Sequence, residues 1–172
     1  AVALALLAGV LSLAAVVTAA PPAGADPVIV PGTISAGGSH TCGVTTAGGA
    51  LCWGSNTGGQ LGNGSTTQSA VPVQVTGLTS GVTAISAGFD HSCAIVSGAA
   101  VCWGGNSLGQ LGDNSTTPSL VPVQVSGLTS GVTAISAGNG YSCAIVSGAA
   151  MCWGSGSSGR LAGSAVRGCI RC

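Results

Sequence analysis

The chain of 172 residues has three Lys or Arg and three Asp or Glu, so its formal net charge is zero and charged residues make up only 3% of it. The three cations, Arg160, Arg167 and Arg171, stand near the C-terminus, and the absence of a basic stripe excludes nucleic acid as an expected partner. With 31 Gly and abundant Val, Ile, Thr and Ser, the composition favours short strands joined by Gly turns. The sequence therefore predicts an all-β fold.

The first 25 residues differ in character from the rest of the chain. The run AVALALLAGVLSLAAVVTAA is apolar almost throughout, two prolines follow at 21–22, and Ala-Gly-Ala at 23–25 supplies a small-residue cleavage pattern before Asp26. We interpret residues 1–25 as a signal peptide whose start is missing. An uncleaved anchor is the alternative, because roughly 20 apolar residues also span a bilayer. We expect the remainder to be secreted or extracytoplasmic, with no stable membrane span after cleavage.

Six of the eight cysteines form pairs that return about every 50 residues, which marks a repeat array: Cys42 with Cys52, Cys93 with Cys102, and Cys143 with Cys152. In an oxidising compartment such thiols form disulfides, whereas the same residues in the cytosol suggest metal or redox chemistry. A tetrahedral metal site needs four converging ligands, and no unit supplies them. We therefore favour a structural role for these cysteines over a catalytic or metal-binding one.

Counting residues in the hairpins supports this pairing. A two-residue loop at Ser97 and Gly98 places Cys93 directly opposite Cys102 at a non-hydrogen-bonded site, where Cα atoms lie about 4.5 Å apart, within the range that a disulfide accepts. The first unit has one more residue between its cysteines. A three-residue loop over 46–48, ending on a left-handed glycine, restores the same opposition there. The sequence thus predicts a disulfide across each hairpin.

Each hairpin also ends in a Cys-Trp dipeptide, at Trp53, Trp103 and Trp153. Neighbours on a strand point to opposite faces, so these rings are predicted to lie in the core between stacked sheets. Around the hairpins recur the segments ISAG, GQLG and VPVQV, which gives about four antiparallel strands per unit, typical of a β-propeller blade.

We divide the chain into propeller repeats over 26–162, with units at 34–84, 85–134 and 135–162, and an irregular tail at 163–172. These amount to about three blades of an incomplete ring. The segment PVIV at 27–30 resembles PVQV within the VPVQV segment, and predicts a blade strand of the same kind at the start of the mature chain.

The repeated motifs resemble those of the regulator of chromosome condensation repeat family over most of residues 34–161. The resemblance rests on four elements: A-G-x-x-H at 36–40 and 87–91, Trp-Gly at the end of each hairpin, Asn56 and Asn106, and the GQLG loops. It implies a seven-bladed β-propeller. Members of this superfamily serve in guanine-nucleotide exchange on a small GTPase, in chromatin contact and, in exported bacterial relatives, in inhibition of β-lactamases, so the resemblance alone does not select one activity.

The chain departs from the family pattern in several ways. It has about three units where the family builds seven, and open blades expose strand edges that favour self-association unless missing sequence covers them. In the third unit Tyr141 replaces the His, Gly156 replaces the Asn, and GRLA at 159–162 stands in place of GQLG. Export and the shortage of charged residues both weaken the expectation of nucleotide exchange.

Three short motifs suggest chemistry, but none gains support from its context. Asp90, His91 and Ser92 contain the triad residue types, yet neighbours on a strand alternate in direction and no relay forms. GSGSSG at 154–159 spells a dinucleotide-binding fingerprint without a following helix. Cys169 and Cys172 leave open a redox pair, half a metal site or a local bridge. We expect no catalytic residue, no metal ion and no cofactor.

The sequence therefore predicts an exported, disulfide-stapled β-propeller module that acts as a non-catalytic scaffold and binds another protein or a cell-surface polymer. Loop residues that differ among the units are the candidate contacts: Phe89, Asp90, Asn139 and Tyr141. Alternatives are an activity like that of a guanine-nucleotide exchange factor or a β-lactamase inhibitor, as the resemblance implies, or a non-functional fragment of a longer repeat protein.

Overall fold

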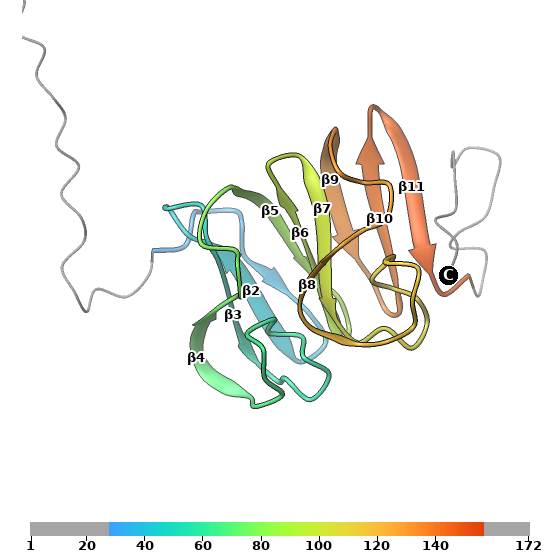
Figure 1. Ribbon diagram of the computed structural model, residues 1–172. Coiled ribbons are helices and arrows are strands. Elements are labelled where there is room, and N and C mark those ends of the chain that lie inside the picture. The colour runs from blue at the N-terminus through green and yellow to red at the C-terminus, as the bar shows by residue number, and fades with distance from the viewer. Residues whose placement is uncertain (1–27, 157–172) are drawn as a thin grey trace, which may run out of the picture.

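The computed structural model describes residues 28–156, and these form eleven β-strands and no helix (Figure 1). The strands make three antiparallel meanders, which we call blades 1, 2 and 3. Blade 1 contains β1 (Ser35–Ala36), β2 (His40–Val44), β3 (Ala50–Gly54) and β4 (Ser69–Gln74). Blade 2 contains β5 (Val82–Ala87), β6 (His91–Val96), β7 (Ala99–Gly104) and β8 (Ser119–Gln124). Blade 3 contains β9 (Val132–Ala137), β10 (Tyr141–Val146) and β11 (Ala149–Gly154).

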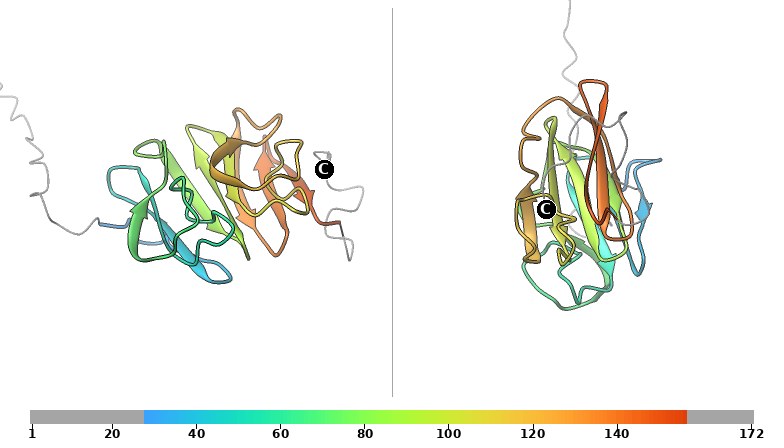
Figure 2. Two further views of the ribbon diagram at one scale, coloured as in Figure 1. Left: turned by 60° about the horizontal axis from the view of Figure 1, so that its bottom comes forward. Right: turned by 90° about the vertical axis from the view of Figure 1, so that its right-hand side faces the viewer.

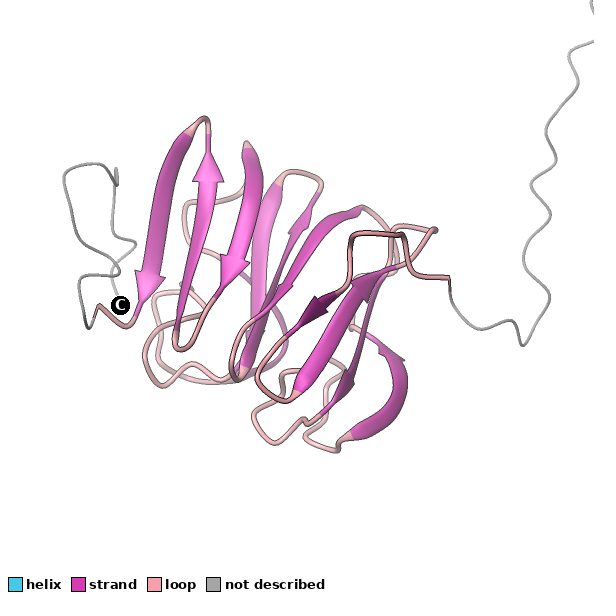
Figure 3. Ribbon diagram, turned by 180° about the vertical axis from the view of Figure 1, so that it is seen from behind, coloured by secondary structure: helices cyan, strands magenta, loops and turns pink. Residues whose placement is uncertain are grey.

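The blades stack face to face in chain order, with blade 1 and blade 3 at opposite ends of the described stack (Figures 1 and 3). The left view of Figure 2 shows the same order along the stack, and the right view looks along the stack from the end of blade 3. Strands β1, β5 and β9 lie next to one another at one side of the stack, and β4 and β8 are the last strands of their sheets. This arrangement confirms the predicted all-β fold of about three propeller blades in an incomplete ring.

The hairpins have the register that residue counting predicts. Cys93 pairs with Cys102 across a turn in which Ser97 and Gly98 have φ of 49° and 81°, the left-handed conformation that a two-residue hairpin turn requires. In blade 1 the backbone N–H of Thr45 donates to the carbonyl of Gly49 at 2.8 Å, so the extra residue is absorbed in the loop. All three predicted disulfides are present, with Cα atoms 4.1, 4.0 and 4.0 Å apart.

Two apolar clusters fill the seams between the blades. Trp103 lies in the cluster between blades 1 and 2, Trp153 lies in the cluster between blades 2 and 3, and both are 0% exposed. Trp53 departs from the prediction of a core tryptophan, because it is only half-buried. Its counterparts each pack against the preceding blade, and no described blade precedes blade 1.

In the described part of the segment PVIV, the predicted blade strand is an isolated bridge, and its partner follows it in the chain. Ile29 pairs with Thr45 and therefore lies on the β1 side of β2. The PVQV segment instead begins in β4 at the opposite edge of the sheet, where Val73 pairs with Cys52. Ile29 thus occupies the place that Val82 has in blade 2, where Val82 pairs with Val96.

Some sequence predictions fall outside residues 28–156. These are the signal peptide at 1–25, the GRLA segment at 159–162, the tail at 163–172, and the Cys169 and Cys172 pair. Within the described part of the chain, no helix is long and apolar enough to cross a membrane.

Candidate functional site

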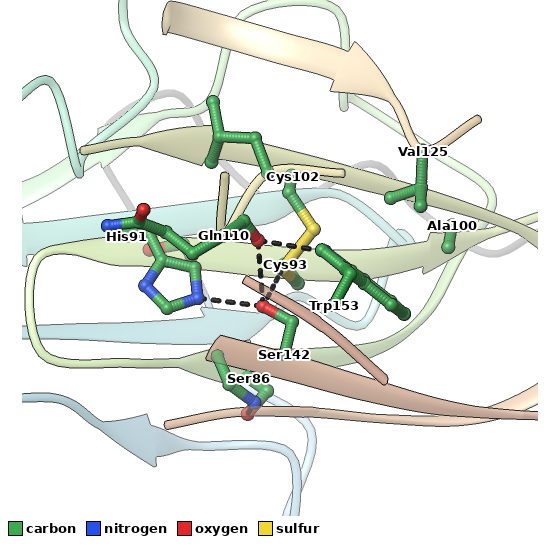
Figure 4. The surroundings of a disulfide bond; sticks show 12 residues. Ser86, His91, Cys93, Ala100, Cys102, Gln110, Val125, Ser142 and Trp153 are labelled. Carbon is green, nitrogen blue, oxygen red and sulfur yellow. Dashed lines mark hydrogen bonds between the residues drawn. A yellow bond between two sulfur atoms is a disulfide. The ribbon is translucent and has the colours of Figure 1, made fainter. Parts of the chain in front are cut away.

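A buried polar cluster joins blades 2 and 3 beside the Cys93–Cys102 disulfide (Figure 4). The Nε2 atom of His91, at the start of β6, lies 2.8 Å from Oγ of Ser142 on β10. The same hydroxyl donates to the backbone carbonyl of Gln110 at 3.0 Å, and the indole N–H of Trp153 donates to that carbonyl at 2.8 Å. One loop carbonyl of blade 2 thus receives two donors from blade 3.

The seam between blades 1 and 2 repeats this cluster atom for atom. His40 Nε2 lies 2.8 Å from Ser92 Oγ, and Ser92 donates to the carbonyl of Gln60 at 3.0 Å. Trp103 donates to the same carbonyl at 2.9 Å. The family motif residues His, Gln and Trp therefore hold successive blades together, which is a structural role.

The hydrogen-bond pattern makes Nε2 the donor atom of both histidines. A carbonyl can only accept, so each Ser hydroxyl donates to the Gln carbonyl and its oxygen accepts from the imidazole Nε2–H. Within residues 28–156 neither His40 Nδ1 nor His91 Nδ1 has a hydrogen-bond partner. Burial, followed by the charge of His91, lowers the pKa of His40 to about 4, while the Asp90 carboxylate acts in the opposite direction.

A buried Asn in each of blades 1 and 2 organises the loop that crosses the seam to the next blade. Asn56 Oδ1 accepts the backbone N–H of Leu61 at 2.9 Å, and its amide donates to the carbonyls of Ser65 and Thr67 at 2.9 and 3.0 Å. Asn106 repeats this arrangement, with Leu111 donating to its Oδ1 at 2.9 Å. The loop carbonyls that receive the Trp and Ser donors are thereby held in position.

The loops that precede β2, β6 and β10 form a continuous row across the three blades, and we call residues 37–39, 88–90 and 138–140 the loop row. The N–H of Gly38 donates to the carbonyl of Gly88 at 3.0 Å, and the N–H of Phe89 donates to the carbonyl of Gly138 at 3.0 Å. Phe89 is 59% exposed, and Asn139 is exposed. The structure therefore brings three of the candidate contacts, Phe89, Asp90 and Asn139, into this row.

Asp90 is anchored at the edge of the second seam. Its Oδ1 accepts a hydrogen bond from Nε2 of Gln110 at 3.2 Å and lies 3.7 Å from Nδ1 of His91, which is an electrostatic contact beyond hydrogen-bonding distance. The proximity of His91, followed by the bond from Gln110, lowers the pKa of the Asp90 carboxyl, although burial acts in the opposite direction. Its side chain is 41% exposed, so the loop row presents a fixed carboxylate to solvent.

Tyr141 lies directly after the loop row as the first residue of β10, and it is half-buried. A Cβ on Gly138 would collide with the Tyr141 ring, so glycine at this position lets the ring lie against the loop backbone. Tyr141 is therefore a neighbour of the row rather than a member of it.

The polar clusters do not form an accessible catalytic site. Ser92 interacts with His40 and Gln60 of blade 1, and His91 interacts with Ser142 of blade 3, so the adjacent Asp90, His91 and Ser92 do not act as a relay. His91 and Ser142 are fully buried, which closes their pair to a substrate. Among residues 28–156, no three His, Cys, Asp or Glu side chains converge as a metal site would require.

Sequence reasoning missed the serines that link the blades. Ser92 and Ser142 accept from a histidine in the preceding blade, while Ser35 and Ser86 accept the backbone N–H of Ala87 and Ala137 at 3.0 and 2.9 Å. A signal was present, since Ser recurs before the first Cys and in ISAG. Its partners, however, lie about 50 residues away and become apparent only once the blades are stacked.

The stacked meanders of three or four strands and their repeated seams define a module of β-propeller blades. The Regulator of chromosome condensation (RCC1) repeat matches residues 47–95 and 97–145, and a second description of the same repeat matches residues 33–60. These matches cover more than half of the chain. The chain belongs to the RCC1 repeat family.

Solved structures of propellers show the same fold at low sequence identity. Human WBSCR16 has a TM-score of 0.66 and 24% identity, over 83% of this chain and 38% of that one. Prp20p from Saccharomyces cerevisiae has a TM-score of 0.63 and 23% identity, over 74% of this chain and 33% of that one. Yeast RCC1 (Prp20) with Kap60 bound to it has a TM-score of 0.59 and 24% identity, over 72% and 28%. The chain spans well under half the length of these proteins. No curated protein matches the sequence.

Proposed function

We propose that this chain is an exported, non-catalytic binding module that holds another protein through its loop row. The proposal rests on a contrast between the contacts that hold the blades together, which are repeated, and the residues at the tips of the loop row, which differ. Both seams repeat the same hydrogen bonds and every blade has its hairpin disulfide, while the residues at the tips differ: Gly38 and Ser39, Phe89 and Asp90, and Asn139 and Gly140. Variable side chains on a repeated, rigid frame are suited to recognition.

The chemistry of the loop row favours a protein as ligand. Phe89 exposes 59% of its surface beside the ionised Asp90 carboxylate. Exposed aromatic side chains next to a fixed polar group are common energetic anchors of protein interfaces. Relatives of similar fold also bind proteins: Kap60 is bound to yeast RCC1 (Prp20), and Prp20p has described binding properties to Gsp1p and histones.

Export is supported by the three disulfides. Disulfides form and persist in oxidising compartments, and small separations of nine or ten residues place each one inside a single hairpin. The apolar run at residues 1–20 agrees with the same interpretation at the level of sequence.

The test uses the oxidised chain, immobilised and exposed separately to secreted proteins and to purified cell-surface polymers of its host. We expect saturable binding to a protein, lost in Phe89→Ser and kept in Val28→Ser. Val28 is a matched control, since it is 62% exposed and lies beside the hairpin turn at the opposite end of blade 1.

Three results would change the proposal. Retention of binding in Phe89→Ser removes the loop row as the contact surface, and binding to the polymer fraction alone replaces the protein ligand with a polymer. Guanine-nucleotide release from a small GTPase would replace the scaffold with an exchange factor.

A further inference from the structure

The tripeptide Gly-Asn-Gly occurs twice in the chain, at 62–64 and at 138–140. Asparagine is a thermally labile residue, and its side-chain amide reacts most readily before glycine, where no Cβ hinders the next backbone nitrogen. Because the residues on both sides are identical, a difference in reactivity between Asn63 and Asn139 would come from the fold.

The reaction in question is deamidation, which takes place within the chain. The backbone nitrogen of the following glycine attacks the side-chain carbonyl carbon of asparagine, its proton passes through solvent to the leaving nitrogen, and ammonia departs as a succinimide ring closes. Water then opens the ring and leaves aspartate or isoaspartate. The reaction therefore needs a side-chain amide that is free to turn and a backbone N–H that is not held by an acceptor.

The fold holds Asn63 in an unreactive arrangement. Its Oδ1 accepts from Nδ2 of Asn56 at 3.3 Å, and from the N–H and the hydroxyl of Ser65 at 3.2 and 3.0 Å. The attacking atom is also engaged, because the N–H of Gly64 donates to the carbonyl of Leu120 at 3.0 Å. These hydrogen bonds must break before the ring can close, which raises the barrier.

Asn139 lacks these restraints. Its side chain is exposed and has no hydrogen-bond partner among residues 28–156. The carbonyl of Gly140 accepts the N–H of Ser155 at 2.8 Å, but the N–H of Gly140 donates to no backbone carbonyl of the described chain. The amide and the nitrogen that attacks it are therefore both available.

This availability belongs to the tip of the loop row and not to the end of the stack. In blade 2, which has a blade on each side, Phe89 stands at the place of Asn139 and is 59% exposed. The N–H of Asp90, which is the counterpart of Gly140, likewise donates to no backbone carbonyl between residues 28 and 156.

The fold also favours glycine at position 140. Its φ of +74° lies in the left-handed region, and a Cβ there would approach Leu108 Cδ1 to 2.6 Å. The reactive pair of Asn139 and Gly140 is thus built into this loop.

We propose that Asn139 is a site of spontaneous deamidation, which converts an amide of the loop row into a carboxylate while Asn63 stays intact. Asp90 is the one charged residue within the loop row, so the reaction adds a second negative charge to it. That charge arises in the loop whose Gly138 carbonyl accepts the N–H of Phe89. Isoaspartate also lengthens the backbone before Gly140 by one CH₂ group. This chemistry is independent of whether the row binds a protein.

The experiment incubates the oxidised, full chain at mildly alkaline pH and quantifies both Gly-Asn-Gly peptides by mass spectrometry, with isoaspartate detected by enzymatic methylation. We expect Asn139 to react at least about tenfold faster than Asn63, since a tenfold ratio requires a barrier difference of only about 1.4 kcal/mol and several hydrogen bonds protect Asn63. The same chain in denaturant is the matched control. There the two asparagines should react at similar rates, because their neighbours are identical.

A pair of variants links the change in charge to Asn139. Asn139→Gln should keep its charge during the incubation, because the longer side chain closes a six-membered ring less readily. The wild type should change into a more acidic form on ion exchange, and the aspartate product should elute with Asn139→Asp.

The inference is overturned if Asn139 stays intact in the folded chain while it reacts in denaturant. It is also overturned if Asn63 and Asn139 react at the same rate in the folded chain, or if Asn139→Gln becomes acidic as fast as the wild type. These results are distinct from the test of ligand binding, which depends on Phe89→Ser.

Discussion

His91 and Ser142, 51 residues apart in the chain, are joined by a buried 2.8 Å hydrogen bond between Nε2 and Oγ across the seam of blades 2 and 3. The same pairing recurs between His40 and Ser92 in the preceding seam. These two histidines are therefore structural residues that hold neighbouring blades together.

Replacement of Ser142 by Ala should destabilise the folded chain. Ser142→Ala leaves the His91 N–H without an acceptor and removes one of the two donors to the Gln110 carbonyl. We expect the free energy of unfolding to fall by about 1–3 kcal/mol, the usual cost of a buried group left unpaired. Urea denaturation measures the change, with Ser136→Ala on the exposed side of β9 as the control. An equal, small effect of both substitutions would show that the seam bond adds little.

Stability should depend on pH through His40. Its pKa is about 4 in the folded state against an ordinary value of 6.5, so between these values the unfolded chain binds the additional proton. The free energy of unfolding should therefore fall as the pH drops from 6.5 to 4, by about 3 kcal/mol in total, and change little through this group below pH 4. NMR of the imidazole checks the cause. His40 should remain neutral at pH 5 in the folded chain, and protonation near pH 6.5 would disprove the account.

Ala substitutions at two glycines distinguish the cost of backbone strain from the cost of a steric clash. Gly112 and Gly127 have similar left-handed φ angles of +67° and +76°, but a Cβ on Gly112 would meet Trp153 Cδ1 and Nε1 at 2.7 Å, whereas a Cβ on Gly127 meets nothing within 4 Å. Gly127→Ala should cost about 1 kcal/mol from the backbone alone. Gly112→Ala should cost a further 1–3 kcal/mol, because the indole has no room to move. Equal melting temperatures of the Gly112→Ala and Gly127→Ala variants would contradict the close packing of Trp153 against Gly112.

The sequence was most informative where structure depends on near neighbours. Hairpin counting placed Cys93 opposite Cys102, because side chains alternate along strands and the turn length sets the register. The hydrogen bonds of the seams are harder to predict from the sequence, because the partner of His91 depends on how two sheets stack. Trp53 and Ile29 show the same limit: each resembles a residue elsewhere in the repeat, but its surroundings depend on which blade lies beside it.

The candidate contacts illustrate a related point. Differences among the repeats identified Phe89, Asp90 and Asn139, and their alignment in one row follows from backbone bonds between successive loops. Tyr141 also differs from its counterparts in the other repeats, yet it begins a strand and packs against the loop backbone. Sequence variation alone does not separate an exposed tip from its support.

The central claim is that each hairpin is closed by its own disulfide, so that the chain is a rigid frame for its loops. Intact mass of the folded, unreduced chain after thiol alkylation tests it most directly. We predict no label on the six hairpin cysteines: Cys42, Cys52, Cys93, Cys102, Cys143 and Cys152. Alkylation of these residues in chains that retain the native β-sheet spectrum would contradict the claim.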